Sequence, residues 1–190
     1  MQPDLHVYID RAWIVVGIVW LAGAIKTKRT ARAQTFGSRL MHLSLAGAAF
    51  VLLFSPKLAL GPLAWRFVPD SAAIAYGGLA LTIAGTGFAI WARAFLGRNW
   101  SANVTIKQGH QMIQSGPYAV VRHPIYSGFL LALLGSALAL GEVRGLLSFT
   151  LAFLTWWLKS RLEENFMQQR FGGEYAAYQR RVKALIPFVI

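Results

Sequence analysis

Hydrophobic residues in this chain are gathered into long blocks, and charged residues are largely confined to the segments between them. An α-helix rises about 1.5 Å per residue, so roughly 20 apolar residues cross the ~30 Å hydrocarbon core of a bilayer. Tryptophan and tyrosine lie near several block ends, as they do at membrane–water interfaces. We therefore predict an all-α integral membrane protein with five transmembrane helices. The predicted helices cover residues 13–25, with a start as early as residue 7, 40–54, 72–92, 125–141 and 145–158.

The residues between the blocks predict how the helices are connected. A Ser-Pro pair at residues 55–56 stops the second helix, since proline cannot continue a helix without breaking it. Asp70 and Ser71 are N-cap candidates for the third helix. Only residues 142–144 separate the last two helices, which predicts a tight antiparallel hairpin. The fifth block is short for a full crossing, so we expect its helix to continue past Leu158 as a cytoplasmic C-terminal helical segment.

Charge is distributed unevenly between the two sides that this topology creates. The chain has 19 Lys and Arg, 7 Asp and Glu, and a net charge of +12. Residues 26–39, 93–124 and 159–190 hold 15 of the basic residues and 3 of the acids, and the other segments are neutral overall. Cytoplasmic loops are enriched in Lys and Arg. We therefore expect a multi-pass protein of a prokaryotic cell membrane, with its N-terminus outside, its C-terminus in the cytoplasm and its first helix retained.

This distribution also bears on the partners of the protein. Basic cytoplasmic segments face anionic lipid headgroups, which accounts for the composition without nucleic acid. The chain has no cysteine, which excludes disulfides, thiolate catalysis and Cys-based zinc sites. Its four histidines are scattered and give no metal-ligand spacing. We expect the lipid bilayer as a partner, and neither nucleic acid nor metal; nothing in the residues indicates an oligomeric state.

The segment SGPYAVVRHPIYSG, residues 115–128, places polar side chains at the start of the fourth predicted helix. Pro124 suits the first turn of a helix, and it disfavours helical backbone at His123, which should be extended. Arg122 and His123 then lie beside the positive end of a helix, where a carboxylate or phosphate is stabilised. The pattern predicts an anion site. The alternative is simple contact with lipid headgroups.

A second polar cluster follows the fifth predicted helix, in residues 159–188. Glu163 and Glu164 are neighbours on a helix and point about 100° apart, so only one of them should face a given cleft. That acid would receive a cationic ligand near the anion site. The alternative is a solvated helix in which Lys159 pairs with Glu163, and Arg161 with Glu164, at helical spacing.

Together the two clusters resemble the isoprenylcysteine carboxyl methyltransferase family. The resemblance lies in the order and spacing of GRNWSANVTIKQGHQMIQSGPYAVVRHPIYSG, a two-helix hairpin, an EE pair and FGGEYAAYQRRVKALIP, over roughly residues 96–188. It implies an all-helical membrane enzyme that transfers a methyl group from S-adenosyl-L-methionine to a lipid-attached acceptor. The cofactor pocket would face the cytosol, and the lipophilic substrate would enter from the membrane. Residues 1–95 would form an N-terminal three-span region, and residues 96–190 the catalytic region.

The resemblance also implies which residues form the site. Arg122, His123 and Lys159 would be catalytic. The family usually has an arginine at the position of Lys159, where it contacts the substrate carboxylate; lysine keeps the charge but loses the bidentate fork. The cofactor contacts would come from Asn103, His110, Gln111, Met112, Ile113, Tyr118, His123, Pro124, Ile125, Tyr126, Glu163 and Glu164.

Three other functions remain open. A phospholipid N-methyltransferase acts on an amine, which must lose a proton and would require a base such as His123 or Glu164. An NADPH-dependent sterol-reductase-like enzyme shares the HPxY element but lacks the EE pair. A membrane scaffold without catalysis would not need this spacing. The favoured interpretation is methyl transfer to the carboxylate of an isoprenylcysteine-like substrate, which is ionised at neutral pH and needs no general base.

Overall fold

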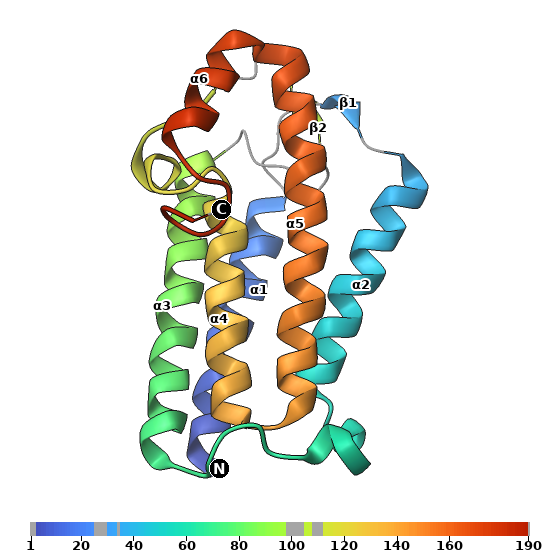
Figure 1. Ribbon diagram of the computed structural model, residues 1–190, viewed down its shortest axis with the longest axis vertical. Coiled ribbons are helices and arrows are strands. Elements are labelled where there is room, and N and C mark those ends of the chain that lie inside the picture. The colour runs from blue at the N-terminus through green and yellow to red at the C-terminus, as the bar shows by residue number, and fades with distance from the viewer. Residues whose placement is uncertain (1–2, 25–29, 34, 98–104, 108–111, 190) are drawn as a thin grey trace.

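A computed structural model of the chain describes residues 3–24, 30–33, 35–97, 105–107 and 112–189. In this part of the chain, long helices run roughly along the longest axis, and the short helix α6 lies near the C-terminus (Figure 1). The helices are α1 Pro3–Ala24, α2 Phe36–Phe54, α3 Ala72–Leu96, α4 Pro124–Leu140, α5 Val143–Phe171 and α6 Gly173–Arg181. Short 3-10 helices, η1 Pro56–Leu58, η2 Gly61–Ala64 and η4 Gly116–Ala119, lie in the connections. Two short strands, β1 Thr30–Ala33 and β2 Thr105–Lys107, pair antiparallel.

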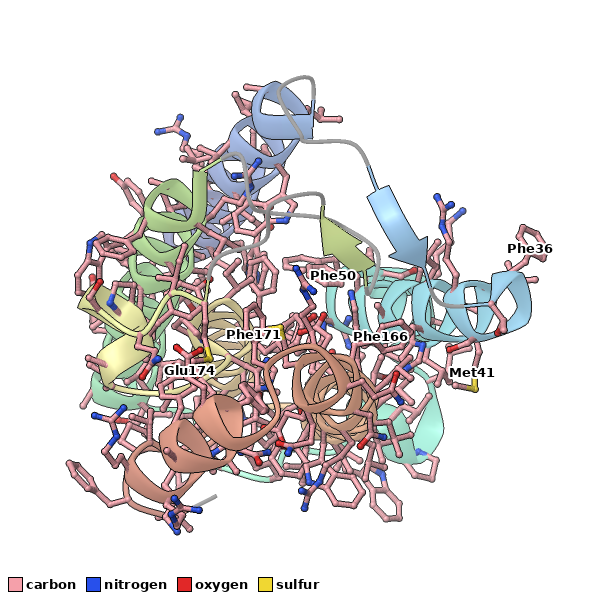
Figure 2. The ribbon with its side chains drawn as sticks, turned by 90° about the horizontal axis from the view of Figure 1, so that it is seen from above. Phe36, Met41, Phe50, Phe166, Phe171 and Glu174 are labelled. Atoms are coloured by element: carbon pink, nitrogen blue, oxygen red, sulfur yellow. The ribbon has the colours of Figure 1, made fainter. Side chains whose placement is uncertain are left out.

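Helices dominate the described residues, and three of them have the length and apolar composition of membrane spans. These are Leu5–Gly23 within α1, Phe36–Phe54 and Ala72–Leu96, with mean hydropathies of 1.5, 1.4 and 1.6. The fourth helix, α4, is a shorter apolar helix. Apolar side chains also point outward, since Phe36 and Met41 are exposed and lie at the outer edge of α2 in Figure 2. The protein is therefore a helical membrane protein, as the sequence predicts.

The first two helices begin earlier than their apolar blocks predict. The first, α1, starts at Pro3, before the predicted start between residues 7 and 13, because no proline or glycine interrupts the polar turns that follow Pro3. The second, α2, starts at Phe36, where the Thr35 hydroxyl accepts a hydrogen bond from the amide of Ser38 at 3.4 Å and caps the helix. Polar residues that flank an apolar block thus belong to the helix itself.

The third helix extends further than predicted at its C-terminal end. Ser71 occupies the N-cap of α3, as predicted, although its side chain forms no capping hydrogen bond. At the other end α3 continues through Arg93 to Leu96. The buried guanidinium of Arg93 donates to the carbonyls of Gly23 and Gly97, at 2.8 and 3.1 Å. A basic residue assigned to a loop is therefore part of the contact between α1 and α3.

The helices α4 and α5 are joined by a short turn and lie side by side (Figure 1). Gly141 ends α4 with φ 75°, a left-handed conformation that glycine adopts without strain. The next helix, α5, continues past Leu158, as predicted. Arg144 in its first turn donates to the carbonyls of Leu53 and Ser55, at 2.9 and 3.0 Å. Carbonyls at the end of a helix have no partner within it, so this contact ties the end of α2 to the start of α5.

Small residues form the interface between α3 and α4. A Cβ atom on Gly85 would lie 2.4 Å from the backbone nitrogen of Ala132 and 2.5 Å from the carbonyl oxygen of Gly128. Gly78 and Gly135 approach each other in the same way further along the two helices. The absence of side chains lets the two backbones pack closely. Since α4 starts directly after the polar loop, this interface also positions that loop against the bundle.

Replacing Gly85 with alanine should therefore destabilise the bundle. The added methyl group overlaps backbone atoms of α4, and overpacking of this kind costs about 1–3 kcal/mol. We expect a lower midpoint of thermal unfolding for Gly85→Ala, measured by circular dichroism in detergent. Gly87→Ala is the matched control, because a Cβ on Gly87 of the same helix would meet no atom within 4 Å. Equal midpoints for the two variants would contradict the packing described.

Candidate active site

The loop before α4 presents Arg122 and His123 on non-helical backbone. His123 is the N-cap of α4, with φ −122° and ψ 61°, so it leaves the helical region but is less extended than a residue before proline usually is. Pro124 takes the first helical position, as predicted, where its missing N–H costs nothing. The loop is therefore oriented by contacts made outside α4.

Those contacts come from the C-terminal segment 182–185, here called the C-terminal clasp. The amide of Arg122 donates to the carbonyl of Lys183 at 2.8 Å, and the amide of His123 donates to that of Ala184 at 3.0 Å. These are the parallel contacts of a short bridge between the loop and the clasp. Backbone groups at the end of the chain thus fix the direction in which both side chains of the loop point.

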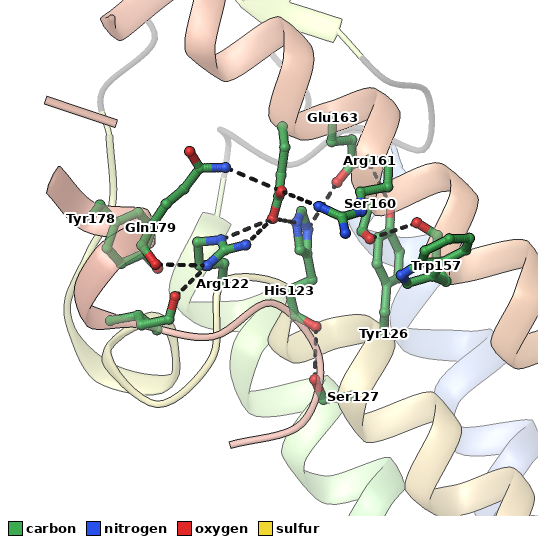
Figure 3. A network of polar contacts seen from close by, with 12 residues as sticks. Arg122, His123, Tyr126, Ser127, Trp157, Ser160, Arg161, Glu163, Tyr178 and Gln179 are labelled. Atoms are coloured by element: carbon green, nitrogen blue, oxygen red, sulfur yellow. Dashed lines mark hydrogen bonds and ion pairs between the residues drawn. The ribbon is translucent and has the colours of Figure 1, made fainter. Parts of the chain in front are cut away.

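Arg122 and Glu164 form a buried ion pair between the loop and α5 (Figure 3). Nε and Nη2 of Arg122 donate to Oε1 of Glu164, at 2.9 and 2.5 Å. Nη1 donates to the carbonyl of Gln179, at 3.3 Å, and to that of Val182. The amide group of Gln179 donates to the other oxygen of Glu164 at 3.2 Å. Arg122 therefore faces protein groups here, whereas the sequence suggests an open anion site.

The imidazole of His123 lies between the two neighbouring acids. Its Nδ1 is 3.3 Å from Oε2 of Glu163, and its Nε2 is 3.3 Å from Oε1 of Glu164. The expectation that only one acid faces the site is wrong. Side chains 100° apart on a helix can still reach one ring, because imidazole carries a nitrogen on each side. On its far side, Glu163 accepts a hydrogen bond from the hydroxyl of Tyr126 at 2.5 Å.

His123, Glu163 and Glu164 lie outside the apolar part of α5. Their mutual contacts shift the pKa of each of these three residues. Burial alone would lower the pKa of His123, but its hydrogen bonds to Glu163 and Glu164 raise it. Burial alone would raise the pKa of each acid. Contacts with His123, Lys159 and Tyr126 nevertheless lower the pKa of Glu163. Contacts with His123 and with the Arg122 guanidinium lower the pKa of Glu164 to about 2. Both carboxylates are therefore ionised at neutral pH, and their contacts favour the protonated form of His123.

An aromatic stack forms one wall beside the network. The ring of Tyr126 stacks on His123 with centroids 5.6 Å apart and on Trp156 with centroids 6.2 Å apart. The ammonium of Lys159 lies 5.4 Å from the centroid of the Tyr126 ring. Trp156 is buried, so it does not belong to the interfacial belt, whereas the neighbouring Trp157 is partly exposed. The ring of Tyr126 thus lies between those of His123 and Trp156.

The structure thus brings six of the predicted site residues together: Arg122, His123, Tyr126, Lys159, Glu163 and Glu164. Tyr118 lies buried in the same loop, and its carbonyl accepts from the Tyr178 hydroxyl at 2.5 Å. Ile125 faces Ala92 of α3. Met112 and Ile113 are half-buried where the described chain resumes before the loop. The predicted cofactor contacts Asn103, His110 and Gln111 fall outside the described residues.

Sequence reasoning missed the residues that support this network. Ser127 donates to the carbonyls of His123 and Leu185, at 3.1 and 2.5 Å, and so links the first turn of α4 to the clasp. Gln179 on α6 contacts both members of the buried ion pair. The spacing of Tyr175 and Tyr178 in the motif FGGEYAAYQRR could have indicated the docking of α6. The two tyrosines are three residues apart, and both are buried. That spacing indicates a helix that docks and does not extend into solvent.

Comparison with known proteins relates this site to a methyltransferase family. A family model described as phospholipid methyltransferase matches residues 73–174. A probable protein-S-isoprenylcysteine O-methyltransferase of Oryza sativa subsp. japonica is 33% identical over 119 residues, which are 61% of this chain and 62% of the relative. Protein-S-isoprenylcysteine O-methyltransferase B of Arabidopsis thaliana is 33% identical over 98 residues, 49% of each chain. The chain thus spans less than two thirds of the length of these relatives.

The fold is similar to that of a solved member of the same group. The structure of the eukaryotic intramembrane Ras methyltransferase ICMT (isoprenylcysteine carboxyl methyltransferase) aligns with a TM-score of 0.58 and 24% identity, over 79% of this chain and 53% of that one. The match to the family model covers more than half of this chain and includes Arg122, His123, Tyr126, Lys159, Glu163 and Glu164, but not Gln179. The chain therefore belongs to the phospholipid methyltransferase family, and it is similar to proteins named isoprenylcysteine O-methyltransferases.

Proposed function

We propose that the protein transfers a methyl group from S-adenosyl-L-methionine to a carboxylate on an isoprenylcysteine-like, lipid-attached acceptor at the membrane–cytosol boundary. The observation that carries the proposal is the imidazole of His123 held between the carboxylates of Glu163 and Glu164 at the start of α4. The names of the relatives, protein-S-isoprenylcysteine O-methyltransferases, agree with this activity.

The residues present fit the proposed cofactor. Glu163 is 25% exposed whereas Glu164 is 5% exposed, so Glu163 can still receive an ammonium group or hydroxyls from a ligand. The positive end of α4 suits a carboxylate. When bound, S-adenosyl-L-methionine would supply a methyl group on a positively charged sulfur. The protein would contribute positioning and the exclusion of water.

The ionisation of the network favours a carboxylate acceptor over an amine. A protonated amine must lose a proton before it can be methylated, and it would require a base. His123 is poorly suited to that role, because both ring nitrogens already face carboxylates. Glu163 and Glu164 are weak bases, because their pKa values are lowered. A carboxylate acceptor arrives ionised and requires none of these residues to accept a proton.

We also propose the membrane topology that this site requires. All of α1 to α4 and the apolar part of α5, residues 143–158, would cross the bilayer, with the C-terminus in the cytoplasm. The 17 residues of α4 span roughly 26 Å, close to the hydrocarbon thickness. The polar network would then lie at the cytoplasmic surface, where a soluble cofactor and a membrane-bound acceptor can meet.

The two acids should respond differently to neutralisation. Glu163→Gln loses a charge-assisted contact to the cofactor, worth on the order of 1.5–3 kcal/mol, and should bind S-adenosylhomocysteine about 10- to 150-fold more weakly in isothermal titration. Glu164→Gln leaves Arg122 buried without its counter-ion and should lower the midpoint of thermal unfolding. Glu174→Gln, an exposed acid of α6, is the control for charge alone. Unchanged binding by a folded Glu163→Gln variant would contradict its role.

The acceptor class can be tested at Lys159. If Lys159 meets a substrate carboxylate, Lys159→Arg should retain or increase turnover, because guanidinium matches a carboxylate with two hydrogen bonds. Lys159→Ala should reduce it about tenfold or more, by loss of a charge-assisted hydrogen bond. The assay measures transfer of labelled methyl to a prenylcysteine analogue and to phosphatidylethanolamine. Lys57→Ala, an exposed lysine of η1, is the control.

Methylation of phosphatidylethanolamine by Lys159→Ala, with none of the prenylcysteine analogue by any variant, would instead favour the phospholipid N-methyltransferase alternative. The description of the matching family makes that alternative worth measuring in the same experiment.

The topology predicts where fused reporters are active. Green fluorescent protein folds in the cytoplasm and alkaline phosphatase only outside it, so the two report opposite sides of a bacterial inner membrane. We expect a fluorescent protein at the C-terminus to be bright, and alkaline phosphatase inserted after Lys57 in the α2–α3 connection to be active. Activity of the phosphatase at the C-terminus would reverse the proposed orientation.

A further inference from the structure

A basic pocket lies on the outer side of α5, next to the buried ion pair. Its volume is about 250 Å³, and its walls include Arg122, Trp157, Ser160, Arg161, Gln179 and Lys183. Arg122 belongs to both the pocket and the polar network, whereas Tyr126, Lys159 and Glu163, which we assign to the methyl-transfer site, do not line the pocket. The pocket therefore opens on a different side of α5, between this helix and the C-terminal clasp.

The charge of the lining favours an anion. Three of the lining residues are basic and none is acidic. The charge of Arg122 is balanced by Glu164. Arg161 is 64% exposed, and its guanidinium is 3.9 Å from the Glu164 carboxylate, at the limit for an ion pair. Lys183 is also exposed. Arg161 comes from α5 and Lys183 from the clasp, so a bound anion would contact both elements at once.

The position of the pocket along α5 favours a lipid as the source of that anion. Trp157 lies in its wall, with the guanidinium of Arg161 5.6 Å from the Trp157 ring centroid. Tryptophan and arginine are both common at the level of the headgroups. Leu154 and Leu158 are exposed on α5, and with Arg161 they have the spacing of one helix face. That face leads from apolar side chains to the basic opening.

We propose that this pocket binds the phosphate group of an anionic phospholipid, with Arg161 and Lys183 as its cationic contacts and the acyl chains along Leu154 and Leu158. The volume fits a headgroup whose remainder lies outside, because sites that enclose a whole small molecule are larger, roughly 300–1,000 Å³. A bound phosphate bridges α5 and the clasp. It therefore steadies the backbone contacts of Lys183 and Ala184 that hold Arg122 and His123.

Lipid binding can be measured without any methyl-transfer assay, so the outcome does not depend on the proposed enzyme activity. Native mass spectrometry of the full chain in neutral detergent gives the affinity for phosphatidylglycerol, for phosphatidylcholine and for inorganic phosphate. We expect phosphatidylglycerol to bind most tightly. The double variant Arg161→Gln/Lys183→Gln should bind it about 25-fold more weakly, roughly fivefold for each cation removed.

The matched control is Arg170→Gln/Arg180→Gln, which removes the same charge from exposed positions that do not line the pocket. Its affinity should equal that of the unaltered chain. Arg161→Gln alone, at an exposed lining cation, serves if the double variant does not fold. An equal loss in the control would show a general surface charge effect and overturn the site. Inorganic phosphate binding as tightly as phosphatidylglycerol would overturn the assignment to a lipid.

Discussion

The C-terminal half of the protein depends on the buried ion pair between Arg122 and Glu164. Removing two charges from water costs several kcal/mol for each ion, and breaking such a pair leaves an uncompensated buried charge. The pair is stable only if its remaining hydrogen-bonding groups also find partners. Those partners are the carbonyls of Gln179 and Val182, the amide of Gln179 and the ring of His123. Because they belong to the loop, α6 and the C-terminal clasp, satisfying one pair on α5 requires all of these elements to be in place.

This requirement separates two acids that look equivalent in the sequence. Glu164 is enclosed by its structural partners, whereas Glu163 faces the other side of the imidazole and keeps an exposed part. The separation follows from the 100° step between neighbours on a helix, with one ring inserted between them. His123 is thereby oriented by two charges at once. An EE pair in such a position supplies one anchor for the fold and one carboxylate that remains accessible to a ligand.

Much of the fold could be predicted from the sequence, because apolar blocks report membrane helices directly and the Arg-His-Pro segment reports the start of α4. The ends of the helices could not be predicted, because the hydrogen bonds of Arg93 to the carbonyls of Gly23 and Gly97 are not evident from the sequence. The family resemblance names residues that the structure brings together, such as His123, Glu163 and Glu164, but it does not predict their contacts. The pairing of the loop with residues 182–185 joins segments about 60 residues apart, and no local periodicity encodes it. Ser127 and Leu185 are similarly far apart in the chain, so their hydrogen bond could not be predicted from local patterns either.

The charges gathered around His123 also constrain which acceptor the proposed site suits. In the described part of the network, the basic side chains of Arg122 and Lys159 lie beside Glu163 and Glu164, and both acids face the ring of His123. These contacts lower the pKa values of both carboxylates, so neither acid is a strong base. A protonated amine would have to lose a proton to such a group before it could be methylated. A carboxylate acceptor is already ionised and needs no such transfer. The contacts that hold the fold together thus favour the anionic acceptor.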